Sequence, residues 1–165
     1  MQLKKQMQLS MLLTLAVVIS IIESFFPIFN NLIPGFKLGL ANVVVVFALF
    51  IFSDKEALYV AVAKVLLVGI LRTGLFSVTF FFSLSGGLLS VLMMILFKKM
   101  NLFSVVGISV IGAVFHGIGQ ILVAAYFINA WQIINYLPIV ILLSIPSGVI
   151  VGVLANKIIF HYENN

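Results

Sequence analysis

Long stretches without any charged residue constrain this chain more than any other feature. Residues 75–97 are 23 consecutive residues without Asp, Glu, Lys or Arg. At 1.5 Å per helical residue, such a stretch crosses about 30 Å of hydrocarbon. Hydrophobic residues make up 64% of the chain, charged residues only 8%, and the mean hydropathy is +1.33. The sequence therefore predicts an integral membrane protein, with residues 1–165 forming one transmembrane domain.

Charges, prolines and polar clusters divide the chain into six apolar segments. They cover residues 9–29, 38–52, 57–71, 75–97, 102–128 and 136–160. We expect an all-α integral membrane protein built as a bundle of six transmembrane helices. The second and third segments are short enough to be re-entrant instead of spanning, so that alternative stays open for both.

The basic residues indicate how the bundle is oriented. With the N-terminus inside, the inner side holds six lysines: Lys4, Lys5, Lys55, Lys98, Lys99 and Lys157. The outer side holds only Lys37 and Arg72. Cytoplasmic loops carry the excess of Lys and Arg, so both termini are predicted to be cytoplasmic. Residues 9–29 are too long for the apolar part of a signal peptide, and we interpret them as a retained first helix.

Several function classes are excluded by what the sequence lacks. There is no cysteine, which excludes disulfides and thiolate metal sites. Topology explains the net charge of +5, so we expect no nucleic-acid binding. The four acids, Glu23, Asp54, Glu56 and Glu163, form no cluster that would hold magnesium against a diphosphate. There is no ATP-binding loop, and no acid is placed to orient His116. We expect a non-catalytic protein without cofactor or metal.

Lys64 and Arg72 are the cations of the third apolar segment and its end. A cation at bilayer depth costs about 2.5–3.5 kcal/mol on insertion scales and usually faces a cavity or a partner. Lys64 therefore contacts either an anionic ligand or Glu23, the one acid well inside a predicted span. Arg72 lies about 80° around a helix from Lys64. It is a candidate ligand contact, with extension to lipid head groups as the alternative.

Two further pairs of polar residues are candidates for a binding site. His116 and Gln120 are one helical turn apart among glycines, where they contact either a ligand or a neighbouring helix. Lys37 and Asn42 lie at the start of the second segment, and helix N-termini favour anions. Contact of Lys37 with lipid head groups is the alternative there.

Small residues interrupt or line several segments. Ser83 and Ser85, followed by two glycines, are typical of a helix that meets a cavity or a close neighbour. Small residues also recur four positions apart at Ala16 and Ser20, at Ala57 and Ala61, and at Ser144, Gly148 and Gly152. Internal helix packing explains this spacing, and a docking surface for another membrane subunit is the alternative.

Three stretches carry a family resemblance: residues 37–42 (KLGLAN), 82–90 (FSLSGGLLS) and 106–120 (VGISVIGAVFHGIGQ), with Tyr136-Leu137-Pro138 following. They resemble a bacterial membrane family, heptaprenyl diphosphate synthase component I, also called the Gx transporter family. That family is similar in size and layout to the S components of energy-coupling-factor (ECF) transporters. The resemblance implies an S-component-like bundle in the bacterial cytoplasmic membrane, with a pocket near the outer face. Its motif positions map onto Lys37, Asn42, Ser83, Ser85, His116 and Gln120.

The sequence and the resemblance together lead to three functional hypotheses. The first is a non-catalytic subunit that binds a small anionic or amphiphilic compound. In that case Ala16 and Ser20 would dock an ECF coupling transmembrane subunit, and two ATPases would drive uptake. The second is the membrane subunit of a heptaprenyl diphosphate synthase complex in isoprenoid quinone side-chain synthesis. The third is a structural membrane scaffold. All three place the chain in contact with the lipid bilayer.

Overall fold

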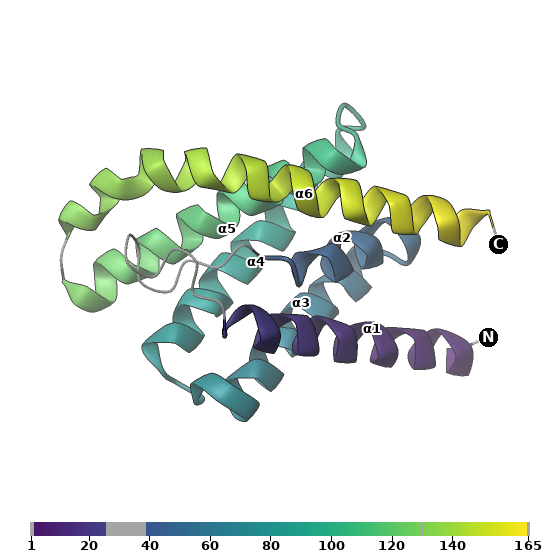
Figure 1. The fold of residues 1–165 in the computed structure, drawn as a ribbon, viewed down its shortest axis with the longest axis horizontal. Coiled ribbons are helices and arrows are strands. Elements are labelled where there is room, and N and C mark those ends of the chain that lie inside the picture. The colour runs from purple at the N-terminus through teal and green to yellow at the C-terminus, as the bar shows by residue number, and fades with distance from the viewer. Residues whose placement is uncertain (1, 26–38, 130, 165) are drawn as a thin grey trace.

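The computed structural model describes residues 2–25, 39–129 and 131–164, and these residues are helical with short connections (Figure 1). Two short helices interrupt the α-helices: a π-helical turn, η1, and a 3-10 helix, η2. The order is α1 (Gln2–Glu23), α2 (Asn42–Ile51), α3 (Asp54–Val68), η1 (Gly69–Thr73), α4 (Val78–Lys99), α5 (Val105–Ile128), η2 (Trp131–Tyr136) and α6 (Leu137–Glu163). The prediction of an all-α protein is confirmed for the described residues.

Four stretches of the described residues are long and apolar enough to cross a membrane. They are Leu3–Glu23, Val78–Lys99, Val105–Phe127 and Trp131–Glu163. Helix α2 has 10 residues and α3 has 15, about 15 Å and 22 Å of helix. These features indicate a multi-pass membrane protein. The prediction of six transmembrane helices is confirmed in part, because six α-helices form but only four are candidate spans.

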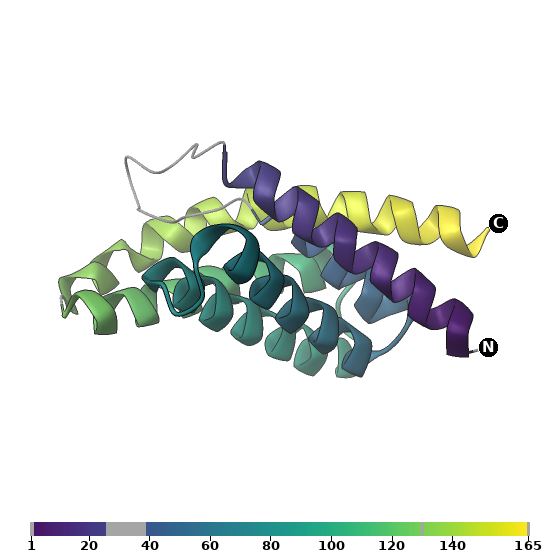
Figure 2. The same cartoon turned by 90° about the horizontal axis from the view of Figure 1, so that it is seen from below.

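Both termini lie at the same end of the molecule (Figures 1 and 2). Helix α1 runs away from this end, and α6 returns to it. Helix α2 begins in the middle of the bundle, and with α3 it forms a hairpin that turns near the terminal end. The shared end agrees with the prediction that both termini face one side of the membrane. The cytoplasmic identity of that side stays a prediction.

Helix α2 is buried although it is short. All residues from Val43 to Leu49 are buried, and α1, α3, α5 and α6 contact the helix. A helix that is apolar on every side belongs in the interior, where other helices instead of lipid surround it. The start of this short helix is thus inside the bundle, where polar groups of neighbouring helices can reach it.

Helix α5 lies between α4 and α6, and glycines allow both contacts (Figure 1). A Cβ atom on Gly148 would lie 2.6 Å from the Cα of Val110, and one on Gly152 would lie 2.7 Å from the Cα of Val106. Such distances leave no room for a side chain. The small residues at 144, 148 and 152 therefore serve internal packing of α6 on α5, as the packing interpretation predicts.

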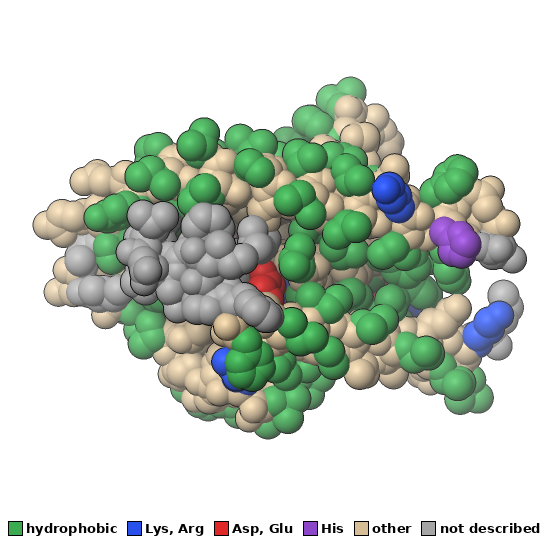
Figure 3. All heavy atoms as spheres, viewed as in Figure 1, with side chains coloured by type: hydrophobic (Ala, Val, Ile, Leu, Met, Phe, Trp, Pro, Cys, Tyr) green, Lys and Arg blue, Asp and Glu red, His purple; other side chains and the backbone are tan. Residues whose placement is uncertain are grey.

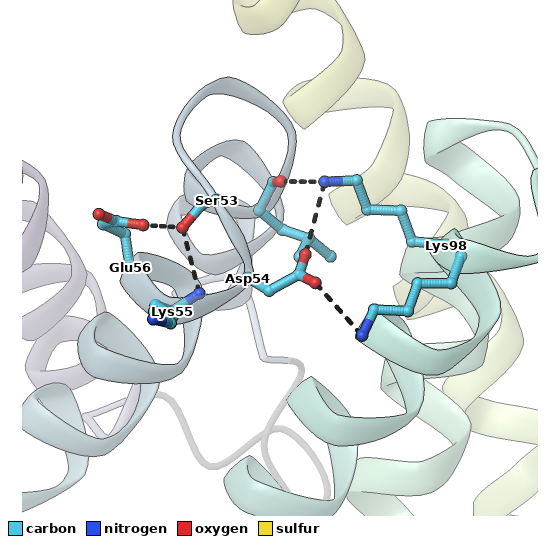
Figure 4. A network of polar contacts seen from close by, with 7 residues as sticks. Ser53, Asp54, Lys55, Glu56 and Lys98 are labelled. Atoms are coloured by element: carbon cyan, nitrogen blue, oxygen red, sulfur yellow. Dashed lines mark hydrogen bonds and ion pairs between the residues drawn. The ribbon is translucent and has the colours of Figure 1, made fainter.

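In the face drawn in Figure 3, basic and His side chains lie at the end that carries the termini, an acidic and a basic side chain lie away from it, and hydrophobic side chains cover much of the rest. At this end Asp54 begins α3 and faces the last turn of α4 (Figure 4). Its two carboxylate oxygens lie 3.7 Å from Lys98 Nζ and 3.8 Å from Lys99 Nζ. Lys98 also donates a hydrogen bond to the carbonyl oxygen of Leu49, at 2.6 Å. These contacts join the α2–α3 turn to α4.

Candidate functional site

A polar cluster lies inside the bundle around the beginning of α2. Asn42 is the first residue of this helix, and its Oδ1 accepts a hydrogen bond from Lys64 Nζ at 2.8 Å. Lys64 projects from α3 and is only 7% exposed. A buried ammonium requires polar partners, because removing the partner of a buried charge costs about 3–5 kcal/mol of stability. Asn42 is one such partner.

Glu23, the last residue of α1, approaches the same place from the other side. Its Oε1 accepts hydrogen bonds from the backbone N–H groups of Gly39 and Leu40, the latter at 3.3 Å. Gly39 has a φ of +76°, which glycine adopts without strain. Backbone bonds from Asn42 N to Gly39 O and from Val43 N to Leu40 O continue this turn into α2. The carboxylate therefore lies at the electropositive end of α2.

Two small cavities adjoin this cluster and share Gly39, Asn42 and His116 in their linings. The first, which we call the lysine cavity, has a volume of about 30 Å³. Its other lining residues are Ser20, Glu23, Ala41, Lys64, Val65, Val68 and Ser83. The second, the serine cavity, has a volume of about 20 Å³. Its other lining residues are Val46, Ser90, Met94, Ser109, Gly112, Ala113, Gly117, Ser144, Ser147 and Val151.

The volumes decide what the cavities can hold in this conformation. A space of this size accommodates one or two water molecules. Pockets for organic ligands of drug size have about 300–1,000 Å³. The cavities enclosed by the described residues are therefore large enough for water or a small inorganic group only. A larger ligand requires side chains or helices to move.

The serine cavity contains an unusual hydroxyl group. Ser109 is 3% exposed, and its Oγ has no hydrogen-bond partner among the described residues. Buried hydroxyl groups are normally hydrogen-bonded because their desolvation is costly. Ser144 Oγ, across the cavity on α6, donates to its own helix at the carbonyl of Val140, at 2.7 Å. The Ser109 hydroxyl could therefore form a hydrogen bond with a molecule bound in this cavity.

Four of the residues predicted for the binding site lie together in this cluster. Asn42, Lys64, Ser83 and His116 all line the lysine cavity. Glu23 lines it as well, so the structure brings Lys64 and Glu23 to one cavity, as either interpretation of Lys64 requires. Lys37 lies outside the described residues.

The other three predicted residues have different positions. Arg72 belongs to the π-helical turn and is exposed; its guanidinium lies 3.9 Å from the centre of the Phe25 ring, and its Nη2 donates to the carbonyl of Ser24 at 3.5 Å. Ser85 Oγ donates to the carbonyl of Gly119 at 3.0 Å and joins α4 to α5. Gln120 is buried on α5, where it lies against Gly86. None of the three lines either cavity.

The two residues predicted to dock a coupling subunit face the interior. Ala16 is fully buried in the core between α1 and its neighbours, and Ser20 lines the lysine cavity. The exposed side of α1 carries large apolar residues instead, among them Met7, Met11 and Leu15. A docking role for Ala16 and Ser20 stays a prediction that would require α1 to turn or shift.

Sequence reasoning assigned no serine of the serine cavity to a binding site, Ser144 being interpreted as a packing residue, and it missed the hydrogen bonds of Glu23 to the turn before α2. Ser144 and Ser147 are three residues apart on α6, a spacing that places both on one helical face. That spacing could have indicated a polar face on α6, although the neighbouring residues are apolar. Among the described residues, no three His, Cys, Asp or Glu side chains come close enough to hold a metal ion.

The model of one protein family, described as heptaprenyl diphosphate synthase component I, matches residues 12–158. The chain belongs to this family. The match to the component I family includes every described residue of the polar cluster, from Ser20 to Ser147. It confirms the resemblance inferred from residues 37–42, 82–90 and 106–120. Comparisons with curated proteins and with solved structures gave no match.

Proposed function

We propose that this chain is the non-catalytic membrane subunit of a heptaprenyl diphosphate synthase in the bacterial cytoplasmic membrane, serving isoprenoid quinone side-chain synthesis. The family match over residues 12–158 carries the proposal. Prenyl chain elongation requires carboxylates that hold magnesium against a diphosphate. Here Asp54 contacts two lysines, Glu56 contacts Lys5, and Glu23 accepts a hydrogen bond from the backbone just before α2. The reaction would therefore take place in a separate catalytic component.

The end that carries the termini suits contact with such a component. It is rich in lysine, and its ion pairs organise the α2–α3 turn (Figure 4). A basic surface beside the bilayer favours association with a partner of opposite charge. In this proposal the membrane subunit holds the synthase where its long apolar product enters the lipid.

Co-expression with a candidate synthase component from the same genome tests the proposal. Prenyl elongation from labelled isopentenyl diphosphate is measured in membrane and soluble fractions, with and without this chain. We expect activity to sediment with the membranes only when the chain is present. An unrelated membrane protein of similar size serves as the control. Full activity and unchanged product length without the chain, together with activity that stays in the soluble fraction when the chain is present, would contradict the proposal.

The polar cluster favours a second candidate function. A buried lysine beside the start of a short interior helix is an arrangement that binds anions in transporters. The chain would then be an S-component-like subunit that binds a small anionic or amphiphilic compound. Its partners would be an ECF coupling transmembrane subunit and two ATPases. Extraction in mild detergent, followed by mass spectrometry of associated proteins and small molecules, tests this candidate. Reproducible absence of those subunits would count against it.

A further inference from the structure

The contact between Glu23 and the turn that leads into α2 has the geometry of an anion held at a binding site. Two backbone N–H groups, of Gly39 and Leu40, converge on one carboxylate oxygen. Lys64 lines the same cavity and is fixed by its bond to Asn42. Backbone N–H groups at a helix start, combined with a buried ammonium, are general recognition elements for carboxylate and phosphate oxygens. The group that occupies them here is a side chain of the protein itself.

The donors and the carboxylate differ in how firmly they are held. The Gly39 and Leu40 amides lie in a turn that is hydrogen-bonded to the first residues of α2, and Lys64 belongs to α3; neighbouring residues of both helices form the main core. Glu23 is the last residue of α1, and only 17% of the apolar stretch of that helix is buried inside the bundle. A side chain at the end of a peripheral helix can rotate away while the donors stay in place. The occupant is thus the displaceable member of the contact.

The serine cavity provides a second, independent indication that a ligand binds beside the start of α2. It shares Gly39, Asn42 and His116 with the lysine cavity. Its buried Ser109 hydroxyl has no partner among the described residues. A tetrahedral oxyanion at the start of α2 would have oxygens left over after contacting the amides and Lys64. Once the Glu23 carboxylate has moved, the two adjoining cavities and the space it leaves would accommodate them.

We propose that Glu23 is an internal occupant of an oxyanion site formed by the Gly39 and Leu40 amides and Lys64, and that the phosphate or carboxylate group of a ligand binds by displacing it. The empty volume is small because the site is filled by this side chain. The inference rests on the proposed binding function for its biological use. It makes a prediction about anion binding that needs no partner subunit.

Neutralising Glu23 should open the site to an external anion. Glu23→Gln removes the carboxylate charge that competes for the site. It also removes the negative charge that shares a cavity with Lys64, and both changes favour binding of an added anion. A tethered group competes at an effective concentration of about millimolar or more, so its removal should raise the affinity at least about tenfold. Glu163→Gln removes the same charge from an exposed position near the C-terminus and is the matched control.

Equilibrium dialysis of purified protein in neutral detergent, with labelled orthophosphate and inorganic diphosphate, measures this affinity. We expect Glu23→Gln to bind at least one of these anions about tenfold more tightly than the wild type. Glu163→Gln should match the wild type, and Glu23→Gln with Lys64→Met should lose the gain. Equal affinity of Glu23→Gln and wild type, or a gain that survives Lys64→Met, would overturn the proposal. Size-exclusion chromatography and circular dichroism verify folding.

Glu23→Asp provides a second variant that keeps the charge. Its shorter side chain withdraws the carboxylate from the Gly39 and Leu40 amides, so a smaller gain in phosphate affinity is expected, and no gain would count against the proposal. Repeating the dialysis in phosphatidylcholine nanodiscs with and without phosphatidic acid distinguishes two sources of the oxyanion. Lower phosphate binding with phosphatidic acid indicates a lipid phosphate, and unchanged binding a soluble anion. Either result supports the site.

A negative dialysis result would overturn the oxyanion site alone. The co-purification and synthase experiments test the proposed functions separately, and their outcome does not depend on it.

Discussion

Lys64 illustrates how one charged side chain is accommodated inside an apolar bundle. It is buried on α3, yet its ammonium donates to Asn42 at the start of α2, and Glu23 lines the same cavity. The lysine thus links α3 to the start of the interior helix α2. Its contacts explain why a charge is tolerated at this depth, because a polar partner replaces part of the lost hydration.

A double-mutant cycle measures the bond between Lys64 and Asn42. Lys64→Met and Asn42→Ala should each lower the free energy of unfolding, and the double variant should lose less than the sum. We expect a coupling of about 1 kcal/mol, typical of hydrogen bonds inside membrane proteins. Unfolding by SDS in mixed micelles provides the measurement. Additive losses would show that the contact contributes nothing to stability.

The same method distinguishes the two interpretations of Lys64. If Lys64 and Glu23 form a structural pair, Lys64→Met leaves a buried carboxylate with less compensation and is destabilising. Adding Glu23→Gln should then restore stability. If the two residues act independently, the double variant shows the sum of both losses. Lys55→Met, a change at an exposed lysine, is the control.

Glu56 lies on α3, outside the four candidate spans, and forms an ion pair near the end of the molecule that carries the termini. The Lys5 ammonium, which donates to its carboxylate, lowers the pKa of Glu56 below the usual value of 4.5. The folded state therefore favours the charged form. The contact stabilises the folded state above about pH 4.5, and this stabilisation is lost as the pH falls through the lowered pKa of Glu56. The effect is modest because this pair is exposed to solvent.

The acid sensitivity of thermal unfolding tests the role of Glu56. Between neutral pH and pH values below about 4.5, the wild type should lose more thermal stability than Glu56→Gln. Glu163→Gln should retain the sensitivity of the wild type. An identical pH dependence for wild type and Glu56→Gln would show that the Lys5 contact does not persist in solution.

Helices α4 and α5 touch closely through glycines beside the polar cluster. A Cβ atom on Gly86 would lie 2.8 Å from the carbonyl oxygen of His116. One on Gly119 would lie 2.9 Å from the carbonyl oxygen of Ser85. The hydrogen bond from Ser85 to Gly119 crosses at the same point. This crossing positions His116, so the packing of two elements and the geometry of the site depend on each other.

Adjacent glycines on α4 allow a matched test of this packing. Gly86→Ala forces a methyl group against backbone, so we expect a loss of about 1–3 kcal/mol in unfolding free energy. At Gly87 the nearest atom to a new Cβ is Val65 Cγ2, at 3.6 Å, which is ordinary contact. Gly87→Ala should be neutral or stabilising by up to about 1 kcal/mol, because alanine favours helix. Equal effects of the two changes on the free energy of unfolding in SDS would contradict the close contact of α4 and α5 at Gly86.

For the molecule as a whole, the arrangement of the ends is the feature with the clearest functional consequence. The termini and the α2–α3 turn lie at one end, and η2 lies at the other (Figure 1). The lysines concentrate at the terminal end, which the distribution of basic residues predicts to be cytoplasmic. A synthase component or a pair of ATPases would have to approach from that side.

Cysteine labelling tests this orientation, since the natural chain has no cysteine. Single variants Lys4→Cys, Lys55→Cys and Lys157→Cys should react with a membrane-impermeant maleimide only after the cells are permeabilised. Gln132→Cys in η2 should react in intact cells. The opposite pattern would reverse the topology. Reaction of Lys55→Cys alone in intact cells would show that the α2–α3 turn lies on the other side.

Much of the fold follows from hydrophobicity along the chain. Each of the six predicted segments overlaps an α-helix, and the fourth, predicted at 75–97, forms as Val78–Lys99. The hydrocarbon layer requires apolar segments of a certain length, and charges and prolines mark their ends. The site was predictable only in part. Asn42, Lys64, Ser83 and His116 do meet, whereas Arg72, Ser85 and Gln120 contact other parts of the bundle.

Composition and the order of apolar segments thus determined that the chain is helical, belongs in a membrane and carries buried polar groups. Only the tertiary structure decided that α2 is a short interior helix, that Glu23 accepts hydrogen bonds from the turn before it and that Arg72 lies away from both cavities. The physical reason is that lipid-facing and interior surfaces of a membrane helix are both apolar. Hydrophobic periodicity therefore does not reveal which face of each helix turns inward, and the close approach of glycine-bearing helices sets those faces.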